Sequence, residues 1–229
     1  MRTTMGSLAN SLAGSTARPT ARSFATGVAL LGLSLALAYA PRADAAAASC
    51  DRTCLRNLLD QYLVAVLAHD PGKAPLAAGF RQTENAVAVP RGKGVWKSVT
   101  ARGKVQRYYM DTVNQSAGFY GTLREGDDGI IATLRLQVAD RRISEAEWII
   151  GRLNTGTPRA DGPGSTSIEG AELSPPPEGP LAKEKRASRA ELMALANGYF
   201  DSLQTDDTSL FIAHPGWART ENGIGTGEG

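Results

Sequence analysis

Two side chains in this sequence are placed so that they could act as acid or base, Glu84 and Tyr62. In the stretch Phe80–Asn85, strand alternation places Phe80, Gln82 and Glu84 on one face. If Phe80 points inward, Glu84 lies among apolar side chains, where a low dielectric shifts a carboxyl pKa and suits a general base. Tyr62 can direct its hydroxyl into the same region. The alternatives are structural: Glu84 accepts hydrogen bonds from the amides of the following loop, and Tyr62 packs in the core.

A second set of residues could bind a ligand without reacting with it. Arg135 could pair with a ligand carboxylate, although an exposed or domain-interface role is the alternative. Four aromatic residues could form a wall for a flat ligand, or could equally pack in the core or on a sheet face: Trp96, Tyr108, Phe119 and Tyr120.

Three other polar residues carry weaker signals. His69 and Asp70 look like an acid–base dyad, but they stand directly before Pro71 at the end of an expected helix, and we expect a structural turn there. Asp111 is a candidate second carboxylate whose orientation the sequence does not give.

Composition excludes several classes of function. The net charge is only +2, so charge gives no reason to expect a nucleic-acid partner. With two cysteines and two histidines in separate segments, we expect no metal site. The sequence also has no phosphate-binding glycine loop and no Ser-His-Asp spacing, and we expect no cofactor.

The N-terminal segment, residues 1–45, has the pattern of a signal peptide. Basic residues precede the apolar run Gly27–Ala40, and Ala43-Asp44-Ala45 supplies small residues for cleavage. An uncleaved anchor or a lipoprotein acylated at Cys50 are the alternatives. We therefore expect an exported protein, periplasmic or secreted, with no stable membrane span after cleavage. Outside the cytosol, Cys50 and Cys54 are expected to form a disulfide that clamps the mature N-terminus.

The elements that would position these residues follow an α+β order. Helical periodicity predicts a helix over Cys54–His69, and Phe80–Asn85 reads as a strand. Tight turns within "REGDDG" and "ADRR" predict an antiparallel meander. Its strands are expected at Val105–Asp111, Ala117–Arg124, Ile130–Ala139 and Ile143–Ile150.

The chain also resembles itself. When Arg52 is aligned with Arg189, Thr83-Glu84-Asn85 falls on Thr220-Glu221-Asn222 without a gap. We call this the self-alignment. From it we expect one complete domain over residues 50–152, a Pro/Gly-rich linker over 153–187 and the start of a second copy over 188–229. Because the second copy lacks the counterpart of the meander, we expect the sequence to be a fragment; the alternative is that this segment docks on another structure.

The order of elements is similar to that of the nuclear transport factor 2-like (NTF2-like, or SnoaL-like) superfamily. More narrowly, "CDRTCL…YLVAVLAHDP…QTENAVAVPRGKGVW…GFYGTL…RISEAEWIIGR" resembles a family of uncharacterised exported fungal and bacterial proteins that carry two related domains. The resemblance implies a curved sheet that wraps helices into a cone, with a pocket at the open end.

Two functions remain open from the sequence. In one, the cone pocket binds a small aromatic or cyclic molecule, and Glu84 is the base of a cofactor-free lyase, dehydratase or isomerase, with Tyr62 and Trp96 shaping the pocket. In the other, the protein is a non-catalytic module that binds a ligand or forms a homodimer through its sheet face.

Overall fold

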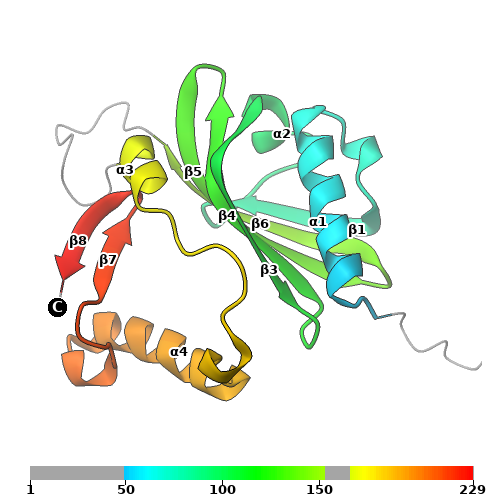
Figure 1. Cartoon of the computed structure of the whole chain (residues 1–229). Helices are drawn as coiled ribbons and strands as arrows, with labels where there is room; N and C mark the ends of the chain where they lie inside the picture. Colours follow the sequence, from blue (N-terminus) through cyan, green and yellow to red (C-terminus); the bar gives the residue numbers. More distant parts are fainter. Residues whose placement is uncertain (1–48, 153–165, 229) are drawn as a thin grey trace, which may run out of the picture. The chain divides into compact units, whose positions relative to one another are not determined.

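The structure is a computed structural model that describes residues 49–152 and 166–228 (Figure 1). The predicted signal peptide and residues 153–165 of the predicted linker lie outside the described residues. We call residues 49–152 the first unit. It contains α1 (Arg52–Leu67), the 3-10 turn η1 (Pro71–Lys73), β1 (Leu76–Glu84), β2 (Val87–Ala88), α2 (Val95–Ser98), β3 (Ala101–Asp111), β4 (Ser116–Glu125), β5 (Asp128–Ala139) and β6 (Arg142–Arg152). Within the described ranges, no helix combines the length and the apolar character needed to cross a membrane.

Six strands form one mixed sheet with the order β2-β1-β6-β5-β4-β3. β3 to β6 are an antiparallel meander, as predicted, and β1 joins its far edge by pairing in parallel with β6. The sheet curves around α1, which contacts β3 and β4 (Figure 1). This is the α+β, NTF2-like cone fold that the order of elements predicted.

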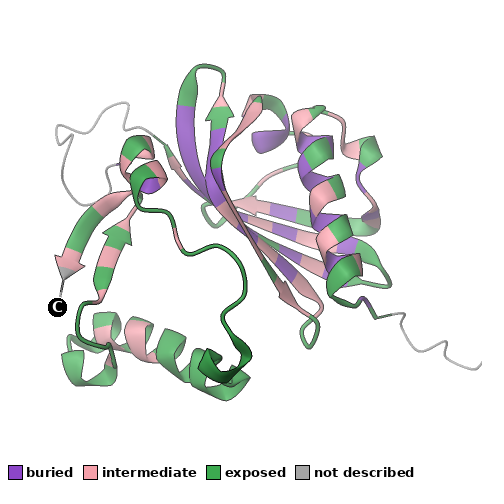
Figure 2. Ribbon diagram, in the orientation of Figure 1, coloured by how far each residue is buried: buried purple, intermediate pink, exposed green. Residues whose placement is uncertain are grey.

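The core lies between α1 and the concave face of the sheet, as the buried stripe in Figure 2 shows. Alternation along β5 separates its two faces: Leu134 and Leu136 are fully buried, whereas Thr133 and Arg135 are exposed on the opposite face. We call the face that carries Arg135 the outer face of the sheet.

Local signals at both ends fix the limits of α1. It begins at Arg52, slightly before the predicted start, because the Asp51 side chain caps it by accepting from the Cys54 amide at 2.7 Å. It ends at Leu67, since His69 has a left-handed backbone (φ 55°). Asp70 then caps η1 by accepting from the Gly72 amide, and so the His69–Asp70 pair forms a turn.

The predicted disulfide between Cys50 and Cys54 is confirmed, with Cα atoms 5.1 Å apart. Cys50 is buried against the core. The Gln115 side chain binds the Cys50 backbone twice: its Oε1 accepts from the amide, and its Nε2 donates to the carbonyl at 3.0 Å. The N-terminus of this unit is therefore fixed to the β3–β4 turn as well as to α1.

A short helix, α3 (Ile168–Leu173), occurs within the segment predicted to be linker. It contacts β3, β4 and β5. The Glu172 carboxylate accepts from the Thr122 hydroxyl and pairs with Lys104 Nζ at 2.9 Å. The sequence did not indicate this helix, because it is too short to show a periodic pattern.

The elements after residue 182 are η2 (Lys183–Lys185), α4 (Arg189–Thr205), η3 (Thr208–Leu210), β7 (Ala218–Glu221) and β8 (Ile224–Glu228). In the self-alignment, the first residues of α4 and η3 fall on the first residues of α1 and η1. The pairs Thr220–Gly225 and Glu221–Ile224 of the β7–β8 hairpin likewise fall on Thr83–Ala88 and Glu84–Val87 of β1 and β2. Most of the large apolar side chains of α4 are exposed, whereas most of those of α1 are buried.

Candidate functional site

Both predicted acid–base residues belong to one buried polar network inside the cone. Gln82 stands at its centre: its Oε1 accepts from the Tyr62 hydroxyl (3.1 Å) and from Trp96 Nε1 (2.6 Å). Its Nε2 donates to Glu84 Oε1 (3.0 Å). The Tyr62 hydroxyl oxygen accepts in turn from Trp148 Nε1 (3.2 Å). Four elements, α1, β1, α2 and β6, are thus joined through side chains that point into the core.

The aromatic members of this network have no surface open to solvent. Tyr62, Trp96 and Trp148 are each 0 % exposed, and Gln82 is 4 % exposed. The Tyr62 ring packs edge-on against Trp96, with centroids 5.1 Å apart. Burial raises the pKa of the Tyr62 hydroxyl well above its ordinary value, outweighing the opposing effect of the Trp148 hydrogen bond. The hydroxyl therefore stays protonated at neutral pH, as its role as donor to Gln82 requires.

Glu84 lies at the edge of the network and is half-buried. Besides Gln82, its Oε1 accepts from the backbone amide of Val95 at 2.8 Å, and so it caps the start of α2. Gly94, the residue before α2, has φ +61°, and a Cβ atom there would overlap the Glu84 carboxylate. This is the structural alternative considered for Glu84, in which the carboxylate accepts from the amide of the following loop.

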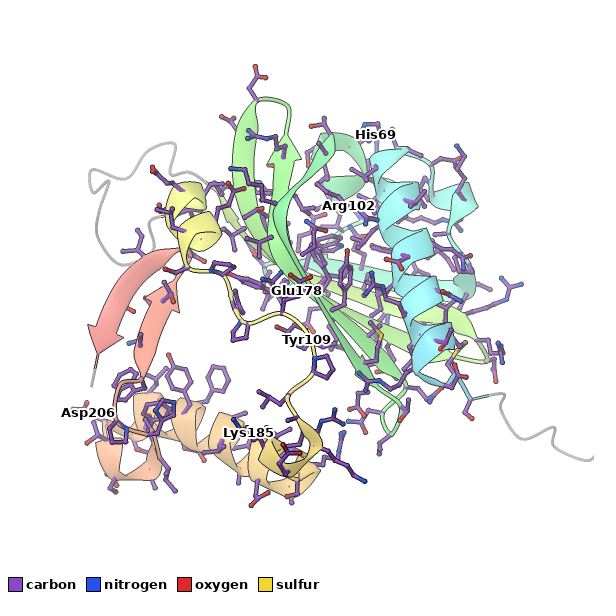
Figure 3. All side chains as sticks on the ribbon, viewed as in Figure 1. His69, Arg102, Tyr109, Glu178, Lys185 and Asp206 are labelled. Carbon is purple, nitrogen blue, oxygen red and sulfur yellow. A yellow bond between two sulfur atoms is a disulfide. The ribbon has the colours of Figure 1, made fainter. Side chains whose placement is uncertain are left out.

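The His69 ring bonds to α2 and not to its neighbour Asp70. The His69 side chain lies beside the end of α1 (Figure 3). Its Nδ1 is 2.8 Å from the carbonyl oxygen of Trp96. Its side chain therefore helps to hold α2 against the end of α1.

The remaining predicted ligand-binding residues do not gather around Glu84. Phe119 is fully buried and packs against Tyr108, with ring centroids 5.7 Å apart. The Arg56 guanidinium lies 3.4 Å from the centre of the Tyr108 ring. Tyr120 follows Phe119 on β4 and points to the outer face, where burial raises its pKa. Asp111 pairs with Arg189 at 2.8 Å.

Arg135 lines a groove of about 590 Å³. We call this the β1–β6 groove. One wall comes from β2 and the residues after it, including Val89, Pro90 and Arg91, and the rest comes from β1, β5 and β6. Its volume lies within the range of about 300–1,000 Å³ that is typical of small-molecule sites.

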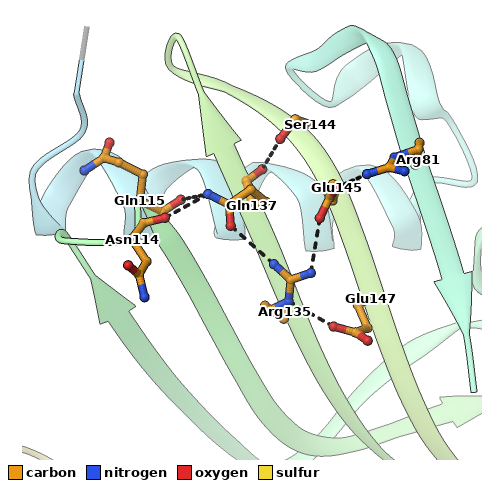
Figure 4. Close-up of polar contacts among 8 residues, drawn as sticks. All are labelled: Arg81, Asn114, Gln115, Arg135, Gln137, Ser144, Glu145 and Glu147. Atoms are coloured by element: carbon orange, nitrogen blue, oxygen red, sulfur yellow. Dashed lines mark hydrogen bonds and ion pairs between the residues drawn. The ribbon is translucent and has the colours of Figure 1, made fainter. Parts of the chain in front are cut away.

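A ladder of alternating charges lines the β1–β6 groove (Figure 4). Arg135 pairs with Glu147 at 2.9 Å and with Glu145 at 3.2 Å, and Arg81 also pairs with Glu145. The hydrogen bonds from Arg81 and then Arg135 hold the pKa of Glu145 below its ordinary value. The hydrogen bond to Glu147 raises the pKa of Arg135. Glu145 and Arg135 are therefore both charged at neutral pH.

Sequence reasoning missed the centre of the interior network and most of the groove. Gln82 was placed on the face of Phe80 and Glu84, but no sequence pattern indicated its hydrogen-bond partners. Arg81 reaches Glu145 through the parallel pairing of β1 with β6, and Trp148 reaches Tyr62 because α1 packs on the sheet; in each pair the two residues are far apart in the sequence. Strand alternation could have placed Glu145 and Glu147 on one face of β6.

The kinds of ligand that the first unit can bind follow from the polar side chains of the interior network and of the groove. Within residues 49–152 and 166–228, no cluster of three or more His, Cys, Asp or Glu side chains could hold a metal ion. The hydrogen-bonding groups of the interior are buried and already paired, whereas the β1–β6 groove has exposed guanidinium groups, which pair with Glu145 and Glu147, beside apolar side chains.

Comparisons with known proteins found one family model that matches part of the chain and several solved structures that are similar to it. The model of the family "Domain of unknown function (DUF8021)" matches residues 185–229, which contain α4, η3, β7 and β8. No curated protein matches the sequence.

Several solved structures are similar to this chain, and two of them illustrate the likeness. One is a protein of unknown function with a cystatin-like fold from Methylobium petroleophilum: 11% identity, TM-score 0.39, covering 49% of this chain and 86% of that one. The other is a "putative ketosteroid isomerase" from Kribbella flavida: 16% identity, TM-score 0.37, covering 59% and 96%. The fold assignment rests on the strand order and on the helix that the sheet wraps, and not on these likenesses.

Proposed function

We propose that this protein is a non-catalytic binding module whose ligand lies in the β1–β6 groove. The observation that carries the proposal is the contrast between the two candidate sites. Tyr62, Trp96 and Trp148 are fully buried and hydrogen-bonded to one another or to Gln82. The groove is open, has the volume of a small-molecule site and contains Arg135.

The lining of the groove favours a ligand with one anionic group and an aromatic or cyclic body. Arg81, Arg91 and Arg135 face two carboxylates, Glu145 and Glu147, which leaves one positive charge in excess. A guanidinium group binds carboxylates through paired N–H donors and stacks on flat rings. Ala88, Val89 and Pro90 supply apolar surface for the body of the ligand.

Because the interior network is buried and the groove is open, a lyase or isomerase that uses Glu84 as its base is the less supported alternative. A general base must come within hydrogen-bonding distance of its substrate. Glu84 Oε1 already accepts from Gln82 and Val95, and Tyr62 has no surface to offer a substrate. We infer that Glu84 and Tyr62 stabilise the interior of the cone.

Two further features belong to the proposal. We infer that residues 188–229 are a second, partial copy of the first unit, which is supported by the helix starts and hairpin pairs that coincide in the self-alignment. We also infer that the protein is exported, which is supported by the Cys50–Cys54 disulfide, since disulfides persist in oxidising compartments.

A ligand screen with matched variants tests the proposed site. Aromatic and alicyclic carboxylates are screened for a rise in melting temperature, and the affinity of each hit is measured by calorimetry. Arg135→Gln is expected to weaken binding about 10- to 100-fold, because one charge-assisted hydrogen bond is worth about 1.5–3 kcal/mol. Arg124→Gln makes the same change at an exposed arginine that does not line the groove and should leave the affinity unchanged.

The outcome for Glu84→Gln separates the two sites. If a hit is lost in Glu84→Gln and retained in Arg135→Gln, the ligand lies in the cone and the proposed site is wrong. A ligand that is turned over by the wild type and not by Glu84→Gln would establish the catalytic alternative.

A further inference from the structure

Asn114 begins the tripeptide Asn114-Gln115-Ser116, which has the pattern Asn-X-Ser of an acceptor site for N-linked glycosylation. Among all the asparagines of the 229-residue sequence, it is the one followed two positions later by Ser or Thr. The middle residue is glutamine and not proline, as the pattern requires. A short motif of this kind occurs by chance, so its place in the fold decides whether it can be used.

The fold places Asn114 in the exposed turn between β3 and β4. The turn backbone is held from both sides: the Asp111 carboxylate accepts from the amides of Val113 (3.0 Å) and Asn114 (3.2 Å), and Gln137 Nε2 donates to the Asn114 carbonyl oxygen (2.8 Å). These bonds engage only the backbone of Val113 and Asn114. The Asn114 side chain points away from Gln137 (Figure 4) and makes no hydrogen bond to any residue that the structure describes.

A glycan on Asn114 would cover a surface where an exposed apolar side chain lies beside an edge strand. Asn114 is exposed, and the neighbouring Val113 is 71% exposed at the tip of the same turn. β3, which leads into this turn, is the last strand at its side of the sheet. Edge strands and exposed apolar side chains favour unwanted pairing between chains, and a bulky polar group beside them opposes it.

The disulfide gives an independent reason to expect the compartment in which this modification occurs. Cys50–Cys54 requires oxidising conditions, which the lumen of the eukaryotic secretory pathway provides. Gln115, the middle residue of the motif, binds the Cys50 backbone through its side-chain amide. The disulfide and the motif therefore meet at one end of the unit.

We propose that Asn114 carries an N-linked glycan when the chain passes through a eukaryotic secretory pathway. The donor is an oligosaccharide linked to a lipid pyrophosphate. A bond forms between Asn114 Nδ2 and C1 of the first sugar, and the bond between C1 and the pyrophosphate oxygen breaks. The lipid pyrophosphate leaves with the electron pair, and the amide nitrogen loses one proton to a base.

Secretion of the full chain from a eukaryotic host tests this proposal. The wild type is expected to carry a mass excess of one oligosaccharide that peptide-N-glycosidase removes, converting Asn114 to aspartate. Asn114→Gln and Ser116→Ala should both abolish the excess, whereas Ser116→Thr should keep it, because threonine also satisfies the motif.

A second measurement needs no variant and so does not depend on whether the variants fold. The secreted wild type is digested with peptide-N-glycosidase in water labelled with oxygen-18 and mapped by mass spectrometry. Labelled aspartate at position 114 is the expected result. Unmodified Asn114 in the secreted wild type would overturn the proposal, as would a mass excess that persists in both Asn114→Gln and Ser116→Ala.

Discussion

Replacement of Gln82 by leucine tests whether the interior network stabilises the fold. Leucine has nearly the size of glutamine but cannot accept from the Tyr62 hydroxyl or from Trp96 Nε1, both of which are fully buried. A buried donor without a partner costs about 1–3 kcal/mol. Two such donors cost about 2–6 kcal/mol, and because the leucine side chain regains some apolar burial we expect a net loss of about 2–4 kcal/mol.

This loss is large for a unit of this size. A change of 1 kcal/mol shifts the melting temperature of a domain of 60–100 residues by about 4–8 °C, so Gln82→Leu should lower it by roughly 10–30 °C. The assay is chemical denaturation followed by tryptophan fluorescence, since Trp96 and Trp148 both lie in the network. Tyr62→Phe, which removes one hydroxyl, should lose about 1–2 kcal/mol.

The matched control is Gln137→Leu, the same change on the outer face. Gln137 bonds to Arg135 and to the Asn114 carbonyl where water can replace it, and its loss should cost less than about 1 kcal/mol. If Gln82→Leu is no more destabilising than Gln137→Leu, the network does not stabilise the cone and the structural role given to Glu84 and Tyr62 is refuted.

Three further predictions concern other parts of the first unit. Gly94→Ala should lower the free energy of unfolding by more than about 2 kcal/mol, because residue 94 has a positive φ and a Cβ atom there would meet the Glu84 carboxylate. Gly79→Ala is the control: a Cβ atom there meets nothing within 4 Å, so the free energy of unfolding should change by less than about 1 kcal/mol. Equilibrium unfolding compares the two variants. Replacing both cysteines by serine should lower the stability by about 2 kcal/mol in thermal melts, since the disulfide closes only a short loop, and an unchanged melt would contradict this. The hydrogen bond from Arg152 lowers the pKa of Glu125 in the folded protein below 4.5. The Glu125–Arg152 pair therefore stabilises the fold above about pH 4.5, and this stabilisation is lost as the pH falls through the folded-state pKa. When unfolding is measured across pH 2–7, the stability of Glu125→Gln should fall less in acid than that of the wild type.

Much of the fold could be predicted from the sequence because the decisive signals are local. The apolar stripe of α1 and the alternation along β5 each lie within one element and describe which face is buried. The tight turn between β5 and β6 is similar: Asp140 and Arg141 both adopt positive φ, as a two-residue hairpin turn requires. From these signals the meander and its concave face follow.

The site was less predictable because it depends on contacts between distant elements. The sequence placed Glu84 and Tyr62 in the same region, and the structure brings them to the same residue, Gln82. The sequence could not show that the space between them is filled, since this depends on how Trp96 and Trp148 pack. Arg135 was a candidate as a single residue, but the groove around it exists only once β1 has paired with β6.

Mapping a bound ligand by NMR tests the proposed site most directly. The protein labelled with nitrogen-15 is titrated with the best carboxylate from the screen, and the backbone amides and indole N–H groups are followed. We expect the amides of Arg81, Val89 and Glu147 to shift, while the indole signals of Trp96 and Trp148 stay in place. If the two indoles shift and the amides of the β1–β6 groove do not, the ligand lies inside the cone and the proposed site is wrong.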